Sequence, residues 1–283
     1  MIKVLKESEA LTGRRLFRGV RFLLRPTAFW LYRMSVRLSS WYQDQTTQQD
    51  PGGLPVPPAL MRFRVGETLD AEIHLTVGRN TVNNISHVLG SNGRSLIDFE
   101  SILDFGCGCG RTLTWLRPEA KHSEIFGTDV DQESILWCQA NLAGLQFSVN
   151  QPDPPLQYAE KSFDLVYAIS VFTHLDQERQ WRWFKELHRI LRPGGWLLIS
   201  LHGRSASNQL SGDDLARLVS DGFLFKTSSK LNGLLPDWYH TAYHTQEYVE
   251  IALSSIFRIV AFLPGGFGLQ DAVILERAME EVS

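Results

Sequence analysis

The chain has 283 residues, of which 43% are hydrophobic and 21% charged, and its net charge is −3. This composition is that of an ordinary globular protein with one sizeable core, and it argues against a chain that binds nucleic acid over its whole surface. Its cysteines (Cys107, Cys109 and Cys138) suggest neither a disulfide framework nor a zinc site, and no signal peptide or run of 18 apolar residues is found. We therefore expect a cytoplasmic protein without a bound metal.

Residues 1–45 are predicted to form a basic, amphipathic helical extension. Residues 1–43 contain nine Lys/Arg and two Glu, and arginines recur at helical spacing up to Pro26, which is expected to break or kink the helix. A second amphipathic stretch runs from Phe29 to Trp41. Residues 14–41 fit either a lid whose apolar face packs on the rest of the chain, or a peripheral contact with an anionic membrane; nucleic acid is the least favoured partner.

Residues 46–95 are predicted to be a linker and an approach to the main domain. A polar and then Pro/Gly-rich stretch leads into PPALMRFRVG, residues 57–66. Either Arg62 or Arg64 could hold a ligand carboxylate through a pair of parallel hydrogen bonds, or could lie on the surface of a strand. We name Arg64 as a candidate substrate contact. A helix is expected over Thr81–Leu89, ended by Gly90.

The central stretch of the chain is Ile102–Thr112, a short apolar strand followed by a glycine-rich turn and the start of a helix. Asp104 lies near the end of the strand, and glycines follow at positions 106, 108 and 110. Glycines allow a ligand to approach the free backbone N–H groups of such a turn. A dinucleotide fingerprint would need its third glycine where Arg111 stands, so a nicotinamide dehydrogenase is disfavoured.

Predicted strands and helices alternate through residues 96–201, which is typical of a parallel α/β sheet. Asp129 ends the second predicted strand, 23 residues after Gly106, and its carboxylate could accept hydrogen bonds from both hydroxyls of a ribose. The predicted strands are Ile102–Asp104, Glu124–Asp129, Leu145–Asn150, Phe163–Ser170 and Trp196–Leu201. Helices are predicted over residues 132–143 and 177–191, the second with Trp181 on its core face.

Four motifs in this order resemble the class I S-adenosylmethionine-dependent methyltransferases: DFGCGCG (104–110), GTD (127–129), FDLV (163–166) and LRPGGWLLIS (191–200). The resemblance implies a Rossmann-like, doubly wound, seven-stranded, mostly parallel sheet with an antiparallel C-terminal hairpin over residues 96–283. Residues 202–245 would form a substrate-side insertion, and the cofactor would be S-adenosylmethionine. The residues expected to contact it are Asp104, Phe105, Gly106, Cys107, Gly108, Gly110, Asp129, Val130, Asn150, Ile169 and Ser170. The segments PPALMRFRVG, YHTQEYV and QDAVIL further resemble a small-molecule or glycan subgroup.

His174 and His202 follow the fourth and fifth predicted strands, so both are candidate bases at the carboxyl edge of the sheet. Tyr243 and His244 are further candidate substrate contacts. The leading hypothesis is in-line methyl transfer to an O or N atom of a small-molecule, glycan or lipid-linked acceptor. The alternatives are an RNA or protein methyltransferase that uses the basic N-terminal arm, and a non-catalytic cofactor-binding module.

Overall fold

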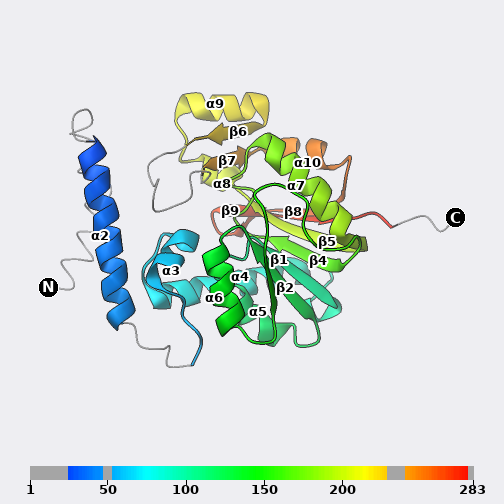
Figure 1. Cartoon of the computed structure of the whole chain (residues 1–283). Helices are drawn as coiled ribbons and strands as arrows, with labels where there is room; N and C mark the ends of the chain where they lie inside the picture. The colour runs from blue at the N-terminus through cyan, green and yellow to red at the C-terminus, as the bar shows by residue number, and fades with distance from the viewer. Residues whose placement is uncertain (1–24, 47–52, 228–239, 280–283) are drawn as a thin grey trace.

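The computed structural model describes residues 25–46, 53–227 and 240–279 (Figure 1). Within these ranges, seven strands form one sheet in the order β3-β2-β1-β4-β5-β9-β8, and β9 is antiparallel to both of its neighbours while the other pairs are parallel. This confirms the predicted fold. The strands are β1 (Ser101–Phe105), β2 (Glu124–Asp129), β3 (Gln146–Val149), β4 (Phe163–Ala168), β5 (Leu191–Leu201), β8 (Arg258–Phe267) and β9 (Gln270–Glu276).

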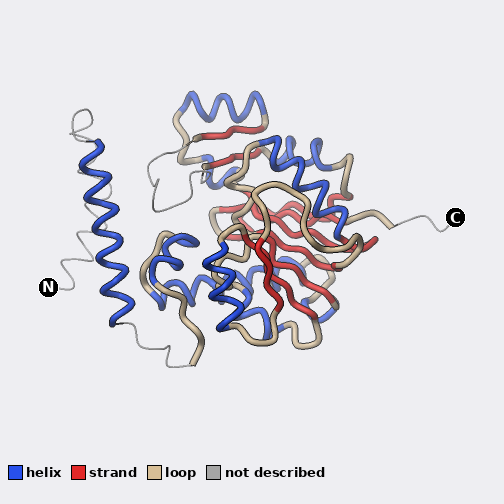
Figure 2. The backbone as a smooth tube through the Cα atoms, viewed as in Figure 1, coloured by secondary structure: helices blue, strands red, loops and turns tan. Residues whose placement is uncertain are grey.

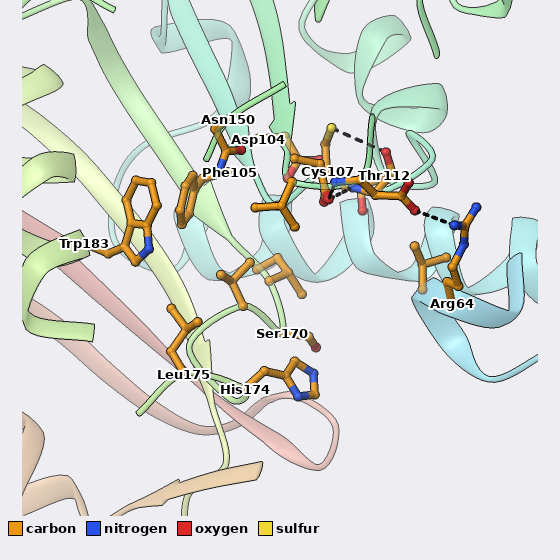
Figure 3. Close-up of a pocket in the computed structure, with 18 of the residues that line it drawn as sticks. Arg64, Asp104, Phe105, Cys107, Thr112, Asn150, Ser170, His174, Leu175 and Trp183 are labelled. Carbon is orange, nitrogen blue, oxygen red and sulfur yellow. Dashed lines mark hydrogen bonds and ion pairs between the residues drawn. The ribbon is translucent and has the colours of Figure 1, made fainter. Parts of the chain in front are cut away.

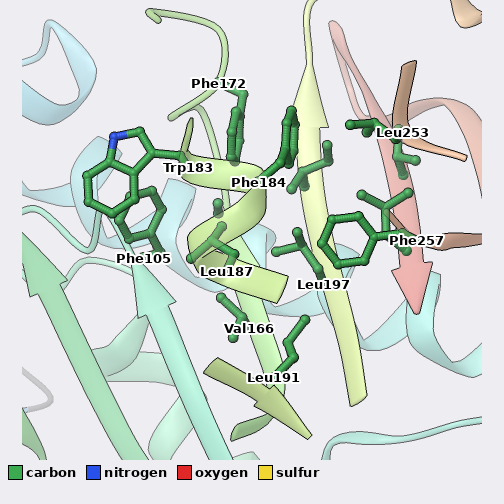
Figure 4. Packing of buried hydrophobic residues seen from close by; sticks show 14 of the residues in the cluster. Phe105, Val166, Phe172, Trp183, Phe184, Leu187, Leu191, Leu197, Leu253 and Phe257 are labelled. Atoms are coloured by element: carbon green, nitrogen blue, oxygen red, sulfur yellow. The ribbon is translucent and has the colours of Figure 1, made fainter. Parts of the chain in front are cut away.

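Helices cover both faces of the sheet (Figure 2). Side chains alternate along each strand: Leu165 and Tyr167 of β4 pack on one side, Val166 and Ala168 on the other. The first side is covered by α4 (Ala71–Gly90), α5 (Leu113–Glu119) and α6 (Gln132–Asn141). The second is covered by α7 (Gln177–Ile190) and α10 (Gln246–Leu253), whose apolar residues pack on β4 and β5 (Figure 4). Burial on both faces explains why β4 is apolar throughout after Asp164.

Helix α7 differs from the prediction at one tryptophan. Trp181, expected in the core, is 36% exposed, whereas Trp183 is 2% exposed and its ring lies 4.6 Å from that of Phe105. Two residues are separated by about 200° around a helix, so only one of the two tryptophans can face the sheet.

Other elements are longer than expected or were not foreseen. Helix α4 starts at Ala71, ten residues before the predicted start, because Asp70 caps it by accepting from the backbone N–H of Ile73. Strand β5 starts at Leu191 rather than Trp196, since Leu191 pairs with Phe163 before a register shift. The 3-10 turn η2 (Leu96–Asp98), α8 (Arg204–Ser207) and the antiparallel pair β6 (Phe223–Lys226) and β7 (Thr241–His244) were not foreseen. Helix α9 (Gly212–Asp221), where the sequence favours a helix near residues 213–220, completes this part.

The segment before the sheet is helical. Helix α2 (Arg25–Thr46) has Pro26 in its first turn, where no intrahelical N–H bond is needed, so α2 accommodates the proline. The helix that Pro26 was expected to break precedes α2 and lies outside the described residues. Helix α2 packs through Val36 on Phe63 of α3 (Ala59–Gly66). The basic residues predicted to form a helix from Arg14 to Arg21 lie outside the described residues. Among the helices that the structure describes, none is long and apolar enough to cross a membrane.

Candidate cofactor and acceptor site

The glycine-rich turn follows β1 and has a backbone that only glycine adopts without strain. Gly106 and Gly108 have φ of +82° and +53°. A Cβ at Gly106 would lie 2.3 Å from Cγ2 of Val171, and a Cβ at Gly108 would lie 2.5 Å from Cγ1 of Val65. Both positions therefore exclude any side chain. The close approach of Val65 also shows that α3 covers the turn.

Two carboxylates lie beside this turn. Asp129 accepts hydrogen bonds from the backbone N–H groups of Gly108 (2.7 Å) and Asp131 (2.8 Å), one on each oxygen, so each oxygen keeps a lone pair for a further donor. Asp104 is 4% exposed, and burial raises its pKa to about 8. Burial also raises the pKa of Asp129, although the two backbone donors oppose the rise.

A pocket opens between the carboxyl ends of β1, β2 and β4 and helix α7 (Figure 3). It collects ten of the eleven predicted cofactor contacts. Gly110 lies outside it, because this glycine packs behind the turn, where a Cβ would lie 2.4 Å from Cδ1 of Leu142. The predicted residues that line it are Asp104, Phe105, Gly106, Cys107, Gly108, Asp129, Val130, Asn150, Ile169 and Ser170, with Arg64 and His174.

Several further residues line this pocket and were not expected there. They follow predicted site residues directly, or come from α3, α7 and the loop before α7. Those that follow a predicted residue could have been found from the sequence, whereas Val65 and Trp183 depend on how helices pack on the sheet. The added residues are Val65, Arg111, Thr112, Asp131, Pro152, Val171, Leu175, Arg179 and Trp183.

The two arginines of α3 have different surroundings. Arg64 lines the pocket and pairs with Asp131 (3.2 Å) and Glu133 (2.6 Å), so its charge is directed at the start of α6. Arg62 is 1% exposed and donates to the carbonyl oxygens of Leu69 and Pro57. Arg62 therefore holds the loops around α3 and is not available to a ligand. Neither arginine lies on a strand.

The candidate bases His174 and His202 are oriented in the same way. Nδ1 of His174 lies 2.7 Å from the carbonyl oxygen of His240, and Nδ1 of His202 lies 3.2 Å from that of Ala242. A carbonyl only accepts, so each Nδ1 carries the proton and each Nε2 presents a lone pair. Burial lowers the pKa of His174 to about 4 and lowers that of His202 as well, so both rings are neutral near pH 7.

His202 does not line the cofactor pocket but is connected to it through Gln270. The amide of Gln270 bonds the hydroxyls of Ser170 and Ser200 and lies 3.5 Å from Nε2 of His202. Ser170 itself has a φ of +62°, a conformation that is uncommon for a residue with a side chain. Gln270 was not predicted as a site residue, since it lies about 70 to 100 positions away from its partners.

The two remaining candidate substrate contacts also lie outside the pocket. The ring of Tyr243 is 5.4 Å from that of His202. His244 is 2% exposed, its Nε2 lies 3.0 Å from Oε1 of Gln180, and burial lowers its pKa to about 3. His244 is therefore part of the packing between β7 and α7. In the part of the chain that the structure describes, no cluster of metal-ligating side chains is present.

Comparisons with known proteins agree with this arrangement. Residues 103–199 match the family described as "Methyltransferase domain". The tRNA N(3)-methylcytidine methyltransferase trm140 of Schizosaccharomyces pombe is 29% identical over 140 residues, which are 45% of this chain and 44% of that protein. A fatty-acid O-methyltransferase of Mycolicibacterium smegmatis is 31% identical over 104 residues, 36% of this chain and 37% of that protein. The chain thus spans less than half the length of either relative.

A solved structure shares the fold. It is the 1,6-didemethyltoxoflavin-N1-methyltransferase of Burkholderia thailandensis, solved with 1,6-didemethyltoxoflavin and S-adenosylhomocysteine bound, and it superposes with a TM-score of 0.50 at 16% identity, covering 71% of this chain and 80% of that one. The glycine turn, its two acids and strands β2, β3 and β4 lie in the part of the chain that matches the family, whereas β8 and β9 follow that part. Residues 103–199 therefore match a methyltransferase domain, and the described sheet has the class I fold of the S-adenosylmethionine-dependent methyltransferases.

Proposed function

We propose that the chain transfers a methyl group from S-adenosylmethionine to an O or N atom of a polar small-molecule, glycan or lipid-linked acceptor. One observation carries the proposal: the glycine turn, the buried Asp104, the half-buried Asp129 and a neutral histidine, His174, line the same pocket. The acids suit a cationic, hydroxylated cofactor, and the histidine suits an acceptor that must lose a proton.

The residues of the turn fit the cofactor group by group. The spare lone pairs of Asp129 would accept from ribose hydroxyls, and Asp104, once its buried carboxyl group has lost its proton, would hold a cationic group of the cofactor. The glycine turn allows the close approach that a side chain would prevent. When bound, the cofactor supplies a methyl group on a positively charged sulfur, which is already a good leaving group, so the protein mainly has to position the acceptor and exclude water.

His174 is the proposed base. Its Nδ1–H is held by the carbonyl oxygen of His240, which orients the ring so that Nε2 is the atom that would take a proton from an acceptor hydroxyl or ammonium. A ring with a pKa of about 4 is in the basic form over the whole neutral range. His202 is joined to Ser170 through Gln270, and it would help to hold Ser170 in place at the edge of the pocket.

A second, more polar pocket adjoins the first and is where we place the acceptor. The two pockets share His174 and Arg179, and the second also contains Asp176, Glu178, Arg182, Phe225 and His240. Acidic and basic side chains together favour an acceptor rich in hydroxyl or other polar groups. The proposed methyl acceptor would therefore reach His174 from the side of β6 and α7.

Calorimetric titration with S-adenosylmethionine and S-adenosylhomocysteine tests this function. We expect Asp129→Ala to weaken the binding of both compounds by about 2 kcal/mol, or roughly thirty-fold in affinity, because charge-assisted hydrogen bonds are lost. Asp213→Ala is the matched control, since Asp213 is an exposed acid on α9. Binding of neither compound to the wild-type protein would overturn the proposal.

An RNA acceptor is the second candidate. It is favoured by the relative that acts on tRNA and by the excess of seven positive charges over residues 1–43. The remainder of the chain is acidic, which opposes it. This candidate predicts RNA binding that weakens steeply with salt and is lost when the lysines and arginines of residues 1–21 are replaced by glutamine.

A further inference from the structure

Helix α2 exposes a row of large apolar side chains. Six of them are 36% to 65% exposed, although side chains of this size are usually covered in a folded domain. These side chains of α2 are therefore not packed on the main domain. We refer to them as the α2 stripe: Trp30, Leu31, Met34, Leu38, Trp41 and Tyr42.

The stripe forms one continuous face. At about 100° per residue, its six members fall within an arc of about 120°. Val36 and Ser40, which are buried, lie on the opposite side of the helix, where Val36 packs on Phe63. The carboxylate of Asp44 also accepts from the backbone N–H of Ala59 at the start of α3. Helix α2 is thus anchored along one side, and it lies at the margin of the molecule, away from the sheet (Figure 1).

The charge of this part of the chain is opposite to that of the rest. Residues 25–43 contain three arginines and no acid. Residues 1–46 contain nine Lys/Arg and three Asp/Glu, whereas the other 237 residues contain nineteen and twenty-eight. By the same helical geometry, Arg37 borders the stripe. A negatively charged surface would neutralise this arm, whereas a second copy of the chain would bring the same positive charges to the contact.

We propose that the α2 stripe lies on the surface of an anionic lipid bilayer. Half of the stripe is Trp or Tyr, whose rings favour the interface between headgroups and acyl chains. Leu31, Met34 and Leu38 would enter the acyl region while the flanking arginines meet the headgroups. Since the opposite side of the helix is held by α3, α2 would lie flat in the plane of the surface. The proposal does not depend on the methyltransferase activity.

Co-sedimentation with vesicles tests it. Wild-type protein should bind vesicles of phosphatidylcholine with 30% phosphatidylglycerol and bind those of phosphatidylcholine alone more weakly. The triple variant Trp30→Ser/Leu38→Ser/Trp41→Ser keeps every charge, and we expect it to bind the anionic vesicles at least ten-fold more weakly, since three buried apolar side chains are lost.

The matched control is Ile97→Ser/Val219→Ser/Ile251→Ser, which removes three apolar side chains that are 69% to 71% exposed but lie away from α2. This variant should bind vesicles like the wild type. Equal binding by the stripe variant, or no binding by the wild type, would overturn the proposal. Light scattering would assign the stripe to a second copy if a wild-type dimer became a monomer in the stripe variant. Titration of the same variants with S-adenosylmethionine measures cofactor binding separately from vesicle binding. A failure of the membrane proposal can therefore be told apart from a failure of the methyltransferase proposal.

Discussion

Replacing Asp104 by asparagine should stabilise the cofactor-free protein and at the same time weaken cofactor binding. The carboxyl group is 4% exposed, and burial raises its pKa from 3.8 to about 8. Between these two values the unfolded chain has lost the proton that the folded chain still holds, so the free energy of unfolding falls as the pH rises. Above pH 8 the destabilisation is complete and constant.

The interval between the two pKa values spans roughly four pH units, each worth about 1.4 kcal/mol. Ionisation of the buried carboxyl group therefore lowers the free energy of unfolding by at most about 6 kcal/mol. A buried asparagine amide that is only partly hydrogen-bonded costs about 1–3 kcal/mol. We therefore expect Asp104→Asn to raise the free energy of unfolding by about 3 kcal/mol at pH 9 and to have little or no stabilising effect at pH 5. The sign of the change in the free energy of unfolding at pH 9 is informative, because most substitutions of buried residues lower the stability of the fold.

Urea unfolding of both proteins at pH 5, 7 and 9 measures this difference, with Glu119→Gln as a control for loss of an exposed charge. Calorimetry with S-adenosylmethionine should show the opposite effect, a loss of affinity in the asparagine variant. A variant that is destabilised at pH 9, or a difference between variant and wild type that does not change with pH, would refute the reasoning about Asp104.

Three further predictions concern the turn, the base and the buried arginine. Gly108→Ala should cost about 2–4 kcal/mol in the free energy of unfolding, because φ is +53° and the new Cβ meets Val65; Gly93→Ala, at φ +84° with nothing within 4 Å, is the control that shows the backbone cost alone. If His174 is the base, kcat/KM should fall on the acid side near pH 4 and kcat should drop in His174→Gln; an acid limb near 6.5 would exclude this ring. Arg62→Met should destabilise by about 3 kcal/mol in thermal or urea unfolding, because two buried carbonyls lose their donor, and a loss below 1 kcal/mol would show that the desolvated charge had offset those bonds.

The cofactor side of the site could be predicted because its chemistry is local in sequence. Asp104, the three glycines and Asp129 come from two consecutive strands and the turn between them, and parallel strands bring their carboxyl ends to one edge. The same rule placed β4 and β5 and therefore His174 and His202 near that edge. The seven-stranded, mostly parallel sheet and its antiparallel C-terminal hairpin followed from the sequence resemblance and are confirmed.

The acceptor side could not be predicted to the same depth. Which nitrogen of His174 carries the proton depends on a carbonyl 66 residues away, and the burial of His244 depends on Gln180, 64 residues away. Gln270 reaches Ser170 across 100 residues. Such contacts join residues that lie far apart in the sequence, and composition alone could not separate a ligand-binding histidine from a packed one.

The backbone carbonyls that hold the two histidines belong to neighbouring residues, His240 and Ala242, at the start of β7. Every amino acid carries a carbonyl, so the side chains of this short segment can change without loss of the orientation of either ring. The cofactor turn, in contrast, tolerates almost no change at Gly106 or Gly108. Acceptor preference and cofactor use can therefore diverge independently, and an exchange of residues 223–244 between relatives is a natural unit for redesigning the acceptor.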